Sequence, residues 1–257
     1  MADPFTVLHF TDPHLFASRD EVMRGVCTYD TLAHTLGVAR ERDWPPDAIL
    51  VTGDIAQDES RLTYEVFRQC FSELGVPVYC LPGNHDNVAF MKATLDSPPF
   101  QFCGHAENDQ WVMVMLNSQR PGKASGKVAT TELERLRSLL EAHPNKHFLV
   151  ALHHHPVATG SRWLDTVPLR NPDEFFGILD QHSNVRCLLW GHIHQVYDQQ
   201  RKGVRLLATP STCSQFLPHS DEFAVDESHP PAYRILQLYR DGSVETTVRW
   251  CEFITAG

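Results

Sequence analysis

Residues 48–54 read Ala-Ile-Leu-Val-Thr-Gly-Asp, a continuous apolar run that ends in Gly53-Asp54. Such a run is typical of a strand buried on both faces, as in the parallel sheets of α/β proteins. Gly53 permits a close approach of the backbone at the end of the strand. Because ligands bind beyond the carboxyl ends of strands in open α/β sheets, the carboxylate of Asp54 lies where a binding site is expected.

Four further polar runs follow apolar segments in the same way. They are Asp12-Pro13-His14, Gly83-Asn84-His85-Asp86, His153-His154-His155-Pro156 and Gly191-His192-Ile193-His194. Together the runs supply carboxylates, an amide and several imidazoles, which suit manganese, iron or zinc, and they contain no thiolate. Their order and their positions after strands indicate a hydrolase that holds two metal ions side by side.

The apolar runs and the patterns between them predict the remaining elements. Strands are expected at 6–10, 48–52, 76–81, 111–116, 147–152, 185–190, 204–209, 234–239 and 244–249, and helices at 29–42, 60–74, 88–95, 132–142 and 171–181. Thr131 and Glu134 are expected to form a capping box at the fourth helix. Early strand–helix alternation followed by mainly strands favours a layered α/β sandwich with mixed sheets. The long irregular stretches 157–170 and 210–231 are expected to contribute to function.

Length and composition fit one domain over residues 1–257, since the chain shows no linker, repeat or low-complexity tract. The net charge of −10 and the lack of a Lys/Arg cluster argue against nucleic acid as a partner. No apolar stretch reaches the roughly 18 residues of a membrane span, and no secretory signal is evident. Seven scattered cysteines without a C-x-x-C fit reduced thiols. A cytoplasmic protein that does not bind membranes is therefore predicted.

A charge count shows what the predicted metal site would attract. The carboxylates of Asp12 and Asp54, two divalent ions and a bridging hydroxide leave a net charge of about +1, so an acidic chain can still attract a phosphate. Metal ions also lower the pKa of bound water from 15.7 toward roughly 7, which provides a nucleophile at neutral pH.

The motifs Asp-x-His, Gly-Asp, Gly-Asn-His-Asp, His-x-Pro and Gly-His-x-His, in this order, resemble those of the calcineurin-like metallophosphoesterases. Three further segments make the sequence similar to the bacterial CpdA-type cyclic AMP phosphodiesterases, the class III cyclic nucleotide phosphodiesterases. These segments are Trp163-Leu164-Asp165, Leu169-Arg170-Asn171 and Leu207-Ala208-Thr209-Pro210-Ser211-Thr212-Cys213. The resemblance implies a four-layer α/β/β/α sandwich of two mixed sheets flanked by helices.

The resemblance also implies a ligand set for two metal ions that share Asp54. The first ion would be held by Asp12, His14, Asp54 and His194, and the second by Asp54, Asn84, His154 and His192. His154 is selected because the ligand in related enzymes lies two residues before the proline, and strand alternation is expected to turn His153 and His155 away. Iron and/or manganese are the expected ions, with zinc as an alternative.

The reaction implied is hydrolysis of 3′,5′-cyclic AMP to 5′-AMP by a metal-bound hydroxide. His85 is expected to act as the acid that protonates the 3′ oxygen. The phosphate is expected near His14, Asp54, Asn84, His85 and His194. Trp163, Arg170 and Phe216 are candidates for a nucleotide pocket, because an aromatic ring stacks on a base and an arginine pairs with phosphate.

Two alternatives remain open at this point. The same site could act on another phosphodiester or a nucleotide pyrophosphate, including a lipid-linked one, although the chain lacks a basic or amphipathic membrane-binding stretch. A catalytically silent cyclic nucleotide binding protein is less favoured, because the ligand set and His85 are intact. His9 is interpreted as a packing residue. Association into a homodimer and the choice between cyclic AMP and cyclic GMP stay open.

Overall fold

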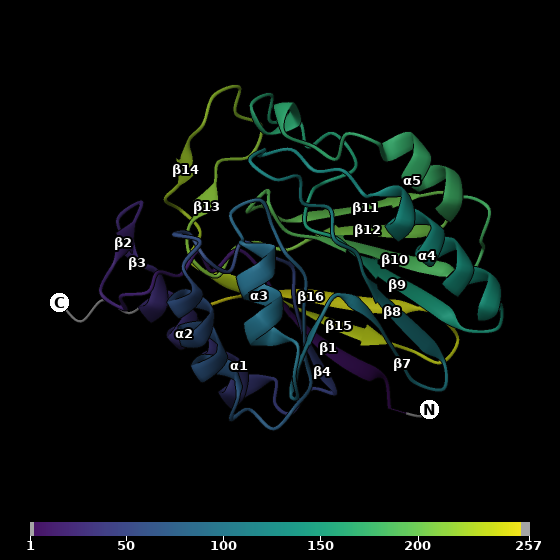
Figure 1. Cartoon of the computed structure of the whole chain (residues 1–257), viewed down its shortest axis with the longest axis horizontal. Coiled ribbons are helices and arrows are strands. Elements are labelled where there is room, and N and C mark those ends of the chain that lie inside the picture. The colour runs from purple at the N-terminus through teal and green to yellow at the C-terminus, as the bar shows by residue number, and fades with distance from the viewer. Residues whose placement is uncertain (1–2, 253–257) are drawn as a thin grey trace.

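Two six-stranded sheets form the centre of the computed structural model, which describes residues 3–252 (Figure 1). The first sheet contains, in spatial order, β16 (Val244–Trp250), β15 (Ala232–Leu238), β1 (Phe5–Phe10), β4 (Ala48–Val51), β5 (Val78–Cys80) and β6 (Phe100–Phe102). The second contains β11 (Tyr197–Arg201), β12 (Val204–Ala208), β10 (Val185–Trp190), β9 (His147–Ala151), β8 (Trp111–Met115) and β7 (Gly104–Glu107).

Both sheets are mixed, as the sequence predicts. In the first sheet β1, β4, β5 and β6 run parallel, β15 pairs antiparallel with β1, and β16 pairs antiparallel with β15. In the second sheet β8, β9, β10 and β12 run parallel, and the edge strands β7 and β11 are antiparallel. The carboxyl ends of the parallel strands in each sheet therefore lie along one edge, where loops can gather into a site.

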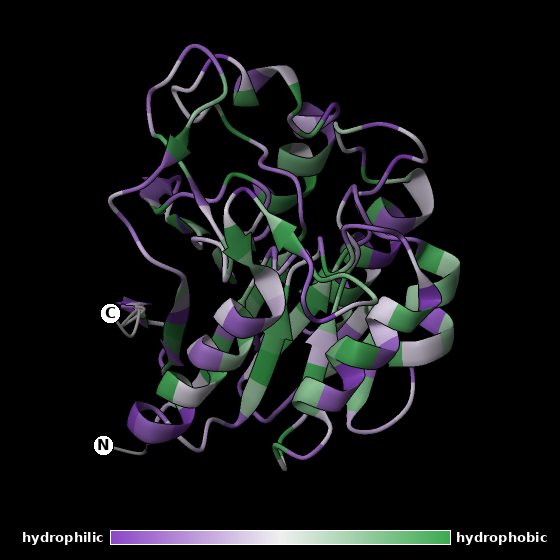
Figure 2. Ribbon diagram, turned by 90° about the vertical axis from the view of Figure 1, so that its left-hand side faces the viewer, coloured by the Kyte–Doolittle hydropathy of each residue, from purple (hydrophilic) through white to green (hydrophobic). Residues whose placement is uncertain are grey.

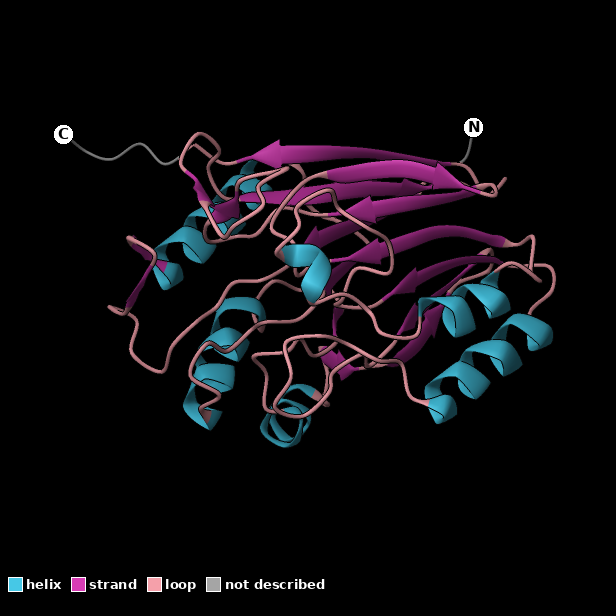
Figure 3. Cartoon of the chain, turned by 90° about the horizontal axis from the view of Figure 1, so that it is seen from above, coloured by secondary structure: helices cyan, strands magenta, loops and turns pink. Residues whose placement is uncertain are grey.

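Helices pack on the outer face of each sheet, so the molecule has four layers. Figure 3 shows the helices, in cyan, lying beside the strands of the sandwich. Leu32, Phe67 and Met91 belong to the helices that pack on the first sheet. Leu136 and Phe175 belong to those that pack on the second. The predicted α/β/β/α sandwich is thereby confirmed. The helices are α1 (Thr28–Arg42), α2 (Arg61–Phe71), α3 (Val88–Leu95), α4 (Thr130–Ala142) and α5 (Pro172–Leu179).

The apolar strands owe their composition to burial on both faces. In β1, Val7 packs between the two sheets, whereas Leu8 packs beneath the helices. Successive side chains of a strand point to opposite faces, so a central strand between two apolar layers needs apolar residues at every position. Figure 2 shows the hydrophobic residues concentrated on the strands and on one side of several helices.

Some local predictions are wrong. The capping box of Thr131 and Glu134 does not form, because α4 begins at Thr130 with Ala129 as its N-cap, and no side chain caps it. The edge strands β6, β7 and β11 were not expected, since they are short or largely polar. The long stretches 157–170 and 210–231 are not wholly irregular. They contain a 3-10 turn (Leu164–Thr166) and a small hairpin of β13 (Gln215–Phe216) and β14 (Val225–Asp226).

A second small hairpin, β2 (Val22–Met23) and β3 (Val26–Cys27), projects beside the first sheet (Figure 1). No helix within residues 3–252 combines the length and the apolar composition that crossing a lipid bilayer requires.

Candidate metal centre

The five motif loops converge between the carboxyl ends of the two sheets. The backbone N–H of Asp12 donates to Gly53 O at 3.1 Å, and that of His14 donates to Asp54 O at 2.9 Å. Across the two sheets, the N–H of His192 donates to Asp12 Oδ2 at 3.0 Å. All the predicted ligands except Asn84 are buried. Backbone N–H groups thus tie the loop after β1 to the loop after β4, and the loop after β10 to the carboxylate of Asp12.

The backbone at five of these positions is left-handed. The φ angles are 51° at Asp12, 46° at His14, 49° at Asp54, 68° at His192 and 49° at His194. Non-glycine residues adopt such angles rarely, and strained residues cluster at functional sites where the surrounding contacts over-determine them. The loops after β1, β4 and β10 therefore turn sharply directly after their strands.

Two motif glycines let the loops touch. A Cβ on Gly83 would overlap Asp54 Oδ1 and the Asp54 backbone, and a Cβ on Gly191 would overlap Thr11 Oγ1. Glycine is required at both positions, because Asp54 and Thr11 are buried and cannot move aside for a larger side chain.

One cluster of acceptors lies between β1 and β10. His14 Nε2 lies 3.2 Å from His194 Nε2, and Asp12 Oδ1 lies 3.5 Å from His194 Nε2. The Nδ1 atoms of these rings are engaged elsewhere, with Gln57 Oε1 at 2.8 Å and with Ser214 O at 2.6 Å. If each Nδ1 donates its proton to that oxygen, the two facing Nε2 atoms of neutral rings both present lone pairs.

A second cluster repeats the arrangement between β9 and β10. His153 Nε2 lies 3.1 Å from His192 Nδ1. His153 Nδ1 donates to Thr52 O at 2.7 Å, and His192 Nε2 donates to Val167 O at 3.1 Å. Here too two neutral rings would face each other with lone pairs. Metal-ligating histidines characteristically donate their other N–H to a carbonyl or carboxylate in this way.

The donor set fits one divalent ion in each cluster. Facing nitrogen lone pairs and carboxylate oxygens repel one another unless a cation or a proton lies among them. The carboxylate of Asp54 belongs to both neighbourhoods, with Oδ2 at 3.8 Å from His14 Nε2 and 3.3 Å from His153 Nε2. Nitrogen and oxygen ligands of this kind suit manganese, iron and zinc.

His153 points into the site, so the expectation that strand alternation turns it away is wrong. Its Nε2 lies 3.3 Å from Asn84 Oδ1 and 3.3 Å from Asp54 Oδ2. Strand β9 ends at Ala151, so the alternation no longer holds at His153, and the bond to Thr52 O fixes the ring instead.

His154 and His155 have different surroundings from His153. His154 Nδ1 lies 2.8 Å from Ser118 Oγ, and its buried Nε2 has no hydrogen-bond partner. It still lies close enough to His153 and His192 for the three rings to form a candidate metal group. His155 Nε2 lies 3.8 Å from Asp165, on the side of the 157–170 loop.

Asp54 and His153 shift each other's pKa in opposite directions. Burial would raise the pKa of Asp54, but His153 and its neighbours hold it well below the usual range. Burial would lower the pKa of His153, but Asp54 and Asp12 raise it to about 9.

Asp86, the last residue of the Gly-Asn-His-Asp motif, has a structural role that the sequence analysis did not assign. Its buried carboxylate accepts hydrogen bonds from Ile55 N at 3.1 Å, Ala56 N at 3.0 Å, Gly83 N at 2.8 Å and Tyr64 Oη at 3.0 Å. It thereby joins the loop after β4 to the loop after β5. Burial and the nearby charge of Asp54 raise the pKa of Asp86 to about 6.

His9 is more than a packing residue. Its ring joins Thr209 Oγ1 at 2.6 Å to Thr52 Oγ1 at 2.7 Å. Thr52 Oγ1 donates to Thr11 Oγ1 at 2.7 Å, and Thr11 Oγ1 donates to Asp12 Oδ2 at 2.6 Å. A buried chain of hydrogen bonds therefore runs from the second sheet to a predicted ligand. In the sequence, the only sign of this hydrogen-bond chain is a polar residue, His9, within a largely apolar strand.

A cavity of about 300 Å³ opens above the clusters, with His14, Asn84, His85 and His194 among its lining. Trp163 and Phe216 line it as predicted. Arg170 does not, because its guanidinium donates to Thr166 O at the protein surface. His85 is held at the cavity by its backbone N–H, which donates to Asp54 Oδ1 at 2.8 Å.

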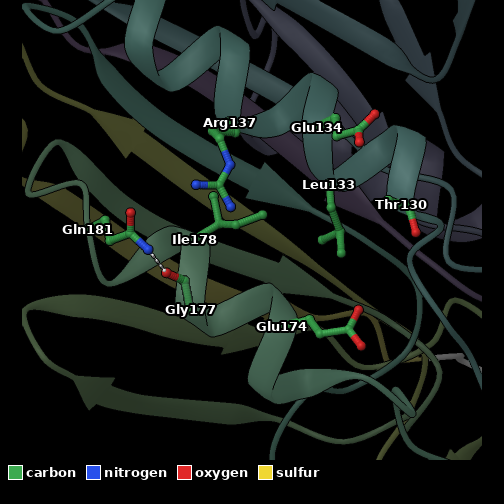
Figure 4. Close-up of a pocket in the computed structure, with 8 residues that line it drawn as sticks. All are labelled: Thr130, Leu133, Glu134, Arg137, Glu174, Gly177, Ile178 and Gln181. Atoms are coloured by element: carbon green, nitrogen blue, oxygen red, sulfur yellow. Dashed lines mark hydrogen bonds between the residues drawn. The ribbon is translucent and has the colours of Figure 1, made fainter.

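Another surface pocket lies between α4 and α5, on the outside of the second sheet (Figure 4). Leu133 and Ile178 line it beside charged side chains such as Arg137 and Glu174, and it contains no histidine. It therefore offers neither the ligands nor the acid that the chemistry of the motif loops requires.

Solved structures share this fold. A dimetal phosphatase from Danio rerio aligns over 98% of this chain and 100% of its own with a TM-score of 0.68 and 17% identity. A purple acid phosphatase from yellow lupin aligns over 98% of this chain and 52% of its own with a TM-score of 0.65 and 11% identity. At such identities the likeness establishes the architecture.

Several curated proteins share a higher sequence identity with this chain than these solved structures do. The chain is 40% identical over 244 residues to the 3′,5′-cyclic adenosine monophosphate phosphodiesterase CpdA of Pseudomonas aeruginosa, covering 94% of this chain and 88% of that protein. It is 40% identical over 247 residues to CpdA of Escherichia coli strain K12, with the same coverage. A 3′,5′-cyclic-nucleotide phosphodiesterase of Nostoc is 34% identical over 245 residues, which are 95% of this chain and 92% of that protein. Residues 5–196 match the family described as calcineurin-like phosphoesterase. The chain thus belongs to the calcineurin-like phosphoesterases.

Proposed function

We propose that this protein hydrolyses 3′,5′-cyclic AMP to 5′-AMP at a dinuclear metal centre. The observation that carries the proposal is the pair of acceptor clusters at the floor of a cavity, because two adjacent cation sites sharing Asp54 suit a phosphodiester. The relatives named as cyclic AMP phosphodiesterases, at 40% identity, support the choice of substrate.

We propose His153 in place of His154 as the histidine of the second ion. The contacts of His153 Nε2 with Asp54, Asn84 and His192 support this choice, whereas the ring of His154 faces Ser118. The remaining ligands are those predicted from the sequence. The ions, iron and/or manganese or alternatively zinc, would supply a water molecule that is acidic enough to act as a nucleophile at neutral pH.

The chain's own residues would orient the phosphate and protonate the leaving group. His85 lines the cavity beside His14, with ring centroids 5.2 Å apart, and it is not needed as a ligand in either cluster. Its imidazole can therefore donate a proton to the 3′ oxygen as the ester bond breaks. The amide of Asn84 lies at the same edge of the cavity and is suited to hold the phosphate near the ions.

We further infer that the chain forms one metallophosphoesterase domain that acts in the cytoplasm on a small-molecule substrate. The single-domain inference is supported by β15 and β16, which follow the second sheet in the chain yet complete the first.

A substrate panel on the manganese-reconstituted protein tests the proposed function. The panel contains cyclic AMP, cyclic GMP, 2′,3′-cyclic AMP, an aryl phosphodiester and an aryl phosphomonoester. We expect turnover of cyclic AMP with 5′-AMP as the product, and its loss on chelation. Rapid turnover of the aryl diester with none of cyclic AMP would refute the substrate and leave the metal centre intact.

A further inference from the structure

The mouth of the cavity is built from three aromatic rings that contact one another. The ring of Trp163 packs edge-on against Phe216 and against Phe223, with centroids 5.1 Å apart in both pairs, and Phe216 meets Phe223 at 5.4 Å. Phe216 also stacks on His194, with centroids 3.9 Å apart and planes 10° from parallel. The three rings therefore extend from His194, a proposed metal ligand, to Phe223 at the surface.

Arg24 closes this mouth from a distant part of the chain. It lies in the turn between β2 and β3, and its guanidinium carbon stands 5.0 Å from the ring centre of Phe216 and 5.1 Å from that of Phe223. Its backbone φ of 52° marks a sharp turn at the tip of this hairpin. Among residues 3–252, no carboxylate lies within ion-pair distance of this guanidinium, which also contacts Met23 Sδ at 3.8 Å.

Packing alone does not account for this arrangement. Phe223 leaves 49% of its surface exposed, and Arg24 is exposed as well, so neither group serves to fill the core. Both nevertheless line the same cavity of about 300 Å³ as His85 and His194. That volume is at the lower end of the range of roughly 300–1,000 Å³ for small-molecule sites. A half-exposed aromatic ring beside a guanidinium without a carboxylate partner is suited to a flat, electron-rich ring.

We propose that the nucleobase of the substrate binds at this mouth, on the faces of Phe223 and Trp163 and beneath the guanidinium of Arg24. The inference rests on the proposed function, because it places the phosphate of the same molecule over the metal clusters. Phe216 spans from His194 to Phe223 and sets the separation between the phosphate and the base. The β2–β3 hairpin thus belongs to the binding site although it carries no metal ligand.

Binding measurements separate base recognition from phosphate recognition and from turnover. We would measure by calorimetry the affinity of the manganese-loaded protein for AMP and for ribose 5-phosphate, which lacks the base. The variants are Arg24→Ala and Phe223→Ala. Arg162→Ala is the matched control, since Arg162 is an exposed arginine of the neighbouring loop that pairs with Asp221.

Each of the two variants should bind AMP about tenfold more weakly, the size of one lost base–aromatic stack, and ribose 5-phosphate as the wild type does. The KM for cyclic AMP should rise by the same factor with little change in kcat. Unchanged AMP affinity would overturn the base site. An equal loss for both ligands would also overturn it, because it would assign Arg24 to the phosphate. The binding experiment decides the question even if cyclic AMP proves not to be hydrolysed.

Discussion

The choice of ring nitrogen decides what each histidine of the centre can do. His153, His192 and His194 each have one nitrogen bound to a backbone carbonyl, so that nitrogen must carry the proton. The other nitrogen is then left with a lone pair directed at the centre. Backbone carbonyls do not titrate or rotate as side chains do, and they therefore fix the tautomers firmly.

This argument predicts different effects for two adjacent histidines. We expect His153→Ala to lose one ion or to bind it much more weakly. The loss of affinity should exceed the roughly 10–100-fold seen when only an outer hydrogen-bond partner of a ligand is removed. His154→Ala should keep both ions. Metal content after dialysis and titration with manganese measure the difference. Loss of an ion from His154→Ala, with both ions kept by His153→Ala, would instead make His154 the ligand.

His85→Ala should separate metal binding from catalysis. The imidazole of His85 is not needed in either ligand cluster, so both ions should remain bound. Losing the proton donor should reduce kcat for cyclic AMP by about 10²–10⁴-fold. The control is His219→Ala, which removes an exposed histidine of the 210–231 loop and should keep wild-type kcat. Wild-type turnover in His85→Ala would exclude the residue as the acid.

At the residue scale, the sequence predicts residue types better than directions. Asp12, Asp54 and His194 could be placed at the centre because each follows an apolar strand in a motif of fixed spacing. His153 could not, because its direction depends on a carbonyl of Thr52, 101 residues away in the chain. Arg24 and Phe223 meet only through tertiary contacts between loops, and no local pattern encodes that contact.

At the scale of elements, the loops after β4 and β5 form one unit held by Asp86. Three backbone N–H groups and the hydroxyl of Tyr64 converge on this carboxylate, so the positions of Asp54 and Asn84 depend on it. If an amide replaced this carboxylate, its NH2 group would face one of the groups that donate to Asp86, and both would be donors.

Asp86→Asn should therefore destabilise the protein by about 1–3 kcal/mol, the cost of leaving a buried donor unsatisfied. It should also lower kcat, because the loop that carries Asp54 loses its anchor. Thermal unfolding and cyclic AMP turnover measure the two effects. The matched control is Asp180→Asn, whose exposed pairs with Arg201 and Lys202 contribute about 0–1 kcal/mol. Equal melting temperatures for the two variants would contradict the anchoring role.

The elements that could be predicted are those with a strong periodic signal. The central strands are nearly continuous apolar runs, and their positions agree with the prediction to within one or two residues. Strand β11 reads Tyr-Asp-Gln-Gln-Arg, so its place at the sheet edge is set by pairing with β12 rather than by its own pattern. The N-cap of α4, Ala129, likewise offers no capping side chain that the sequence could reveal.

At the scale of the whole molecule, the proposed metal centre takes its residues from both sheets. The first cluster combines Asp12 and His14 from the loop after β1 with His194 from the loop after β10. The second combines Asp54 with His153, again from opposite sheets. An apolar layer that includes Leu50 and Leu149 also packs between the two sheets. Ions that bind the folded clusters should therefore stabilise the entire sandwich rather than one loop.

Metal removal should lower the melting temperature of the whole protein in a single transition. An ion present at about 100 times its Kd stabilises the folded state by about 2.7 kcal/mol, and each kcal/mol shifts Tm by about 2–4 °C in a protein of this size. We therefore expect chelation to lower Tm by roughly 5–10 °C and manganese to restore it. His194→Ala should lose part of this shift, since it lacks a ligand that crosses between the sheets. A wild-type Tm that does not respond to chelation, or an undiminished response in His194→Ala, would contradict a centre that joins the two sheets.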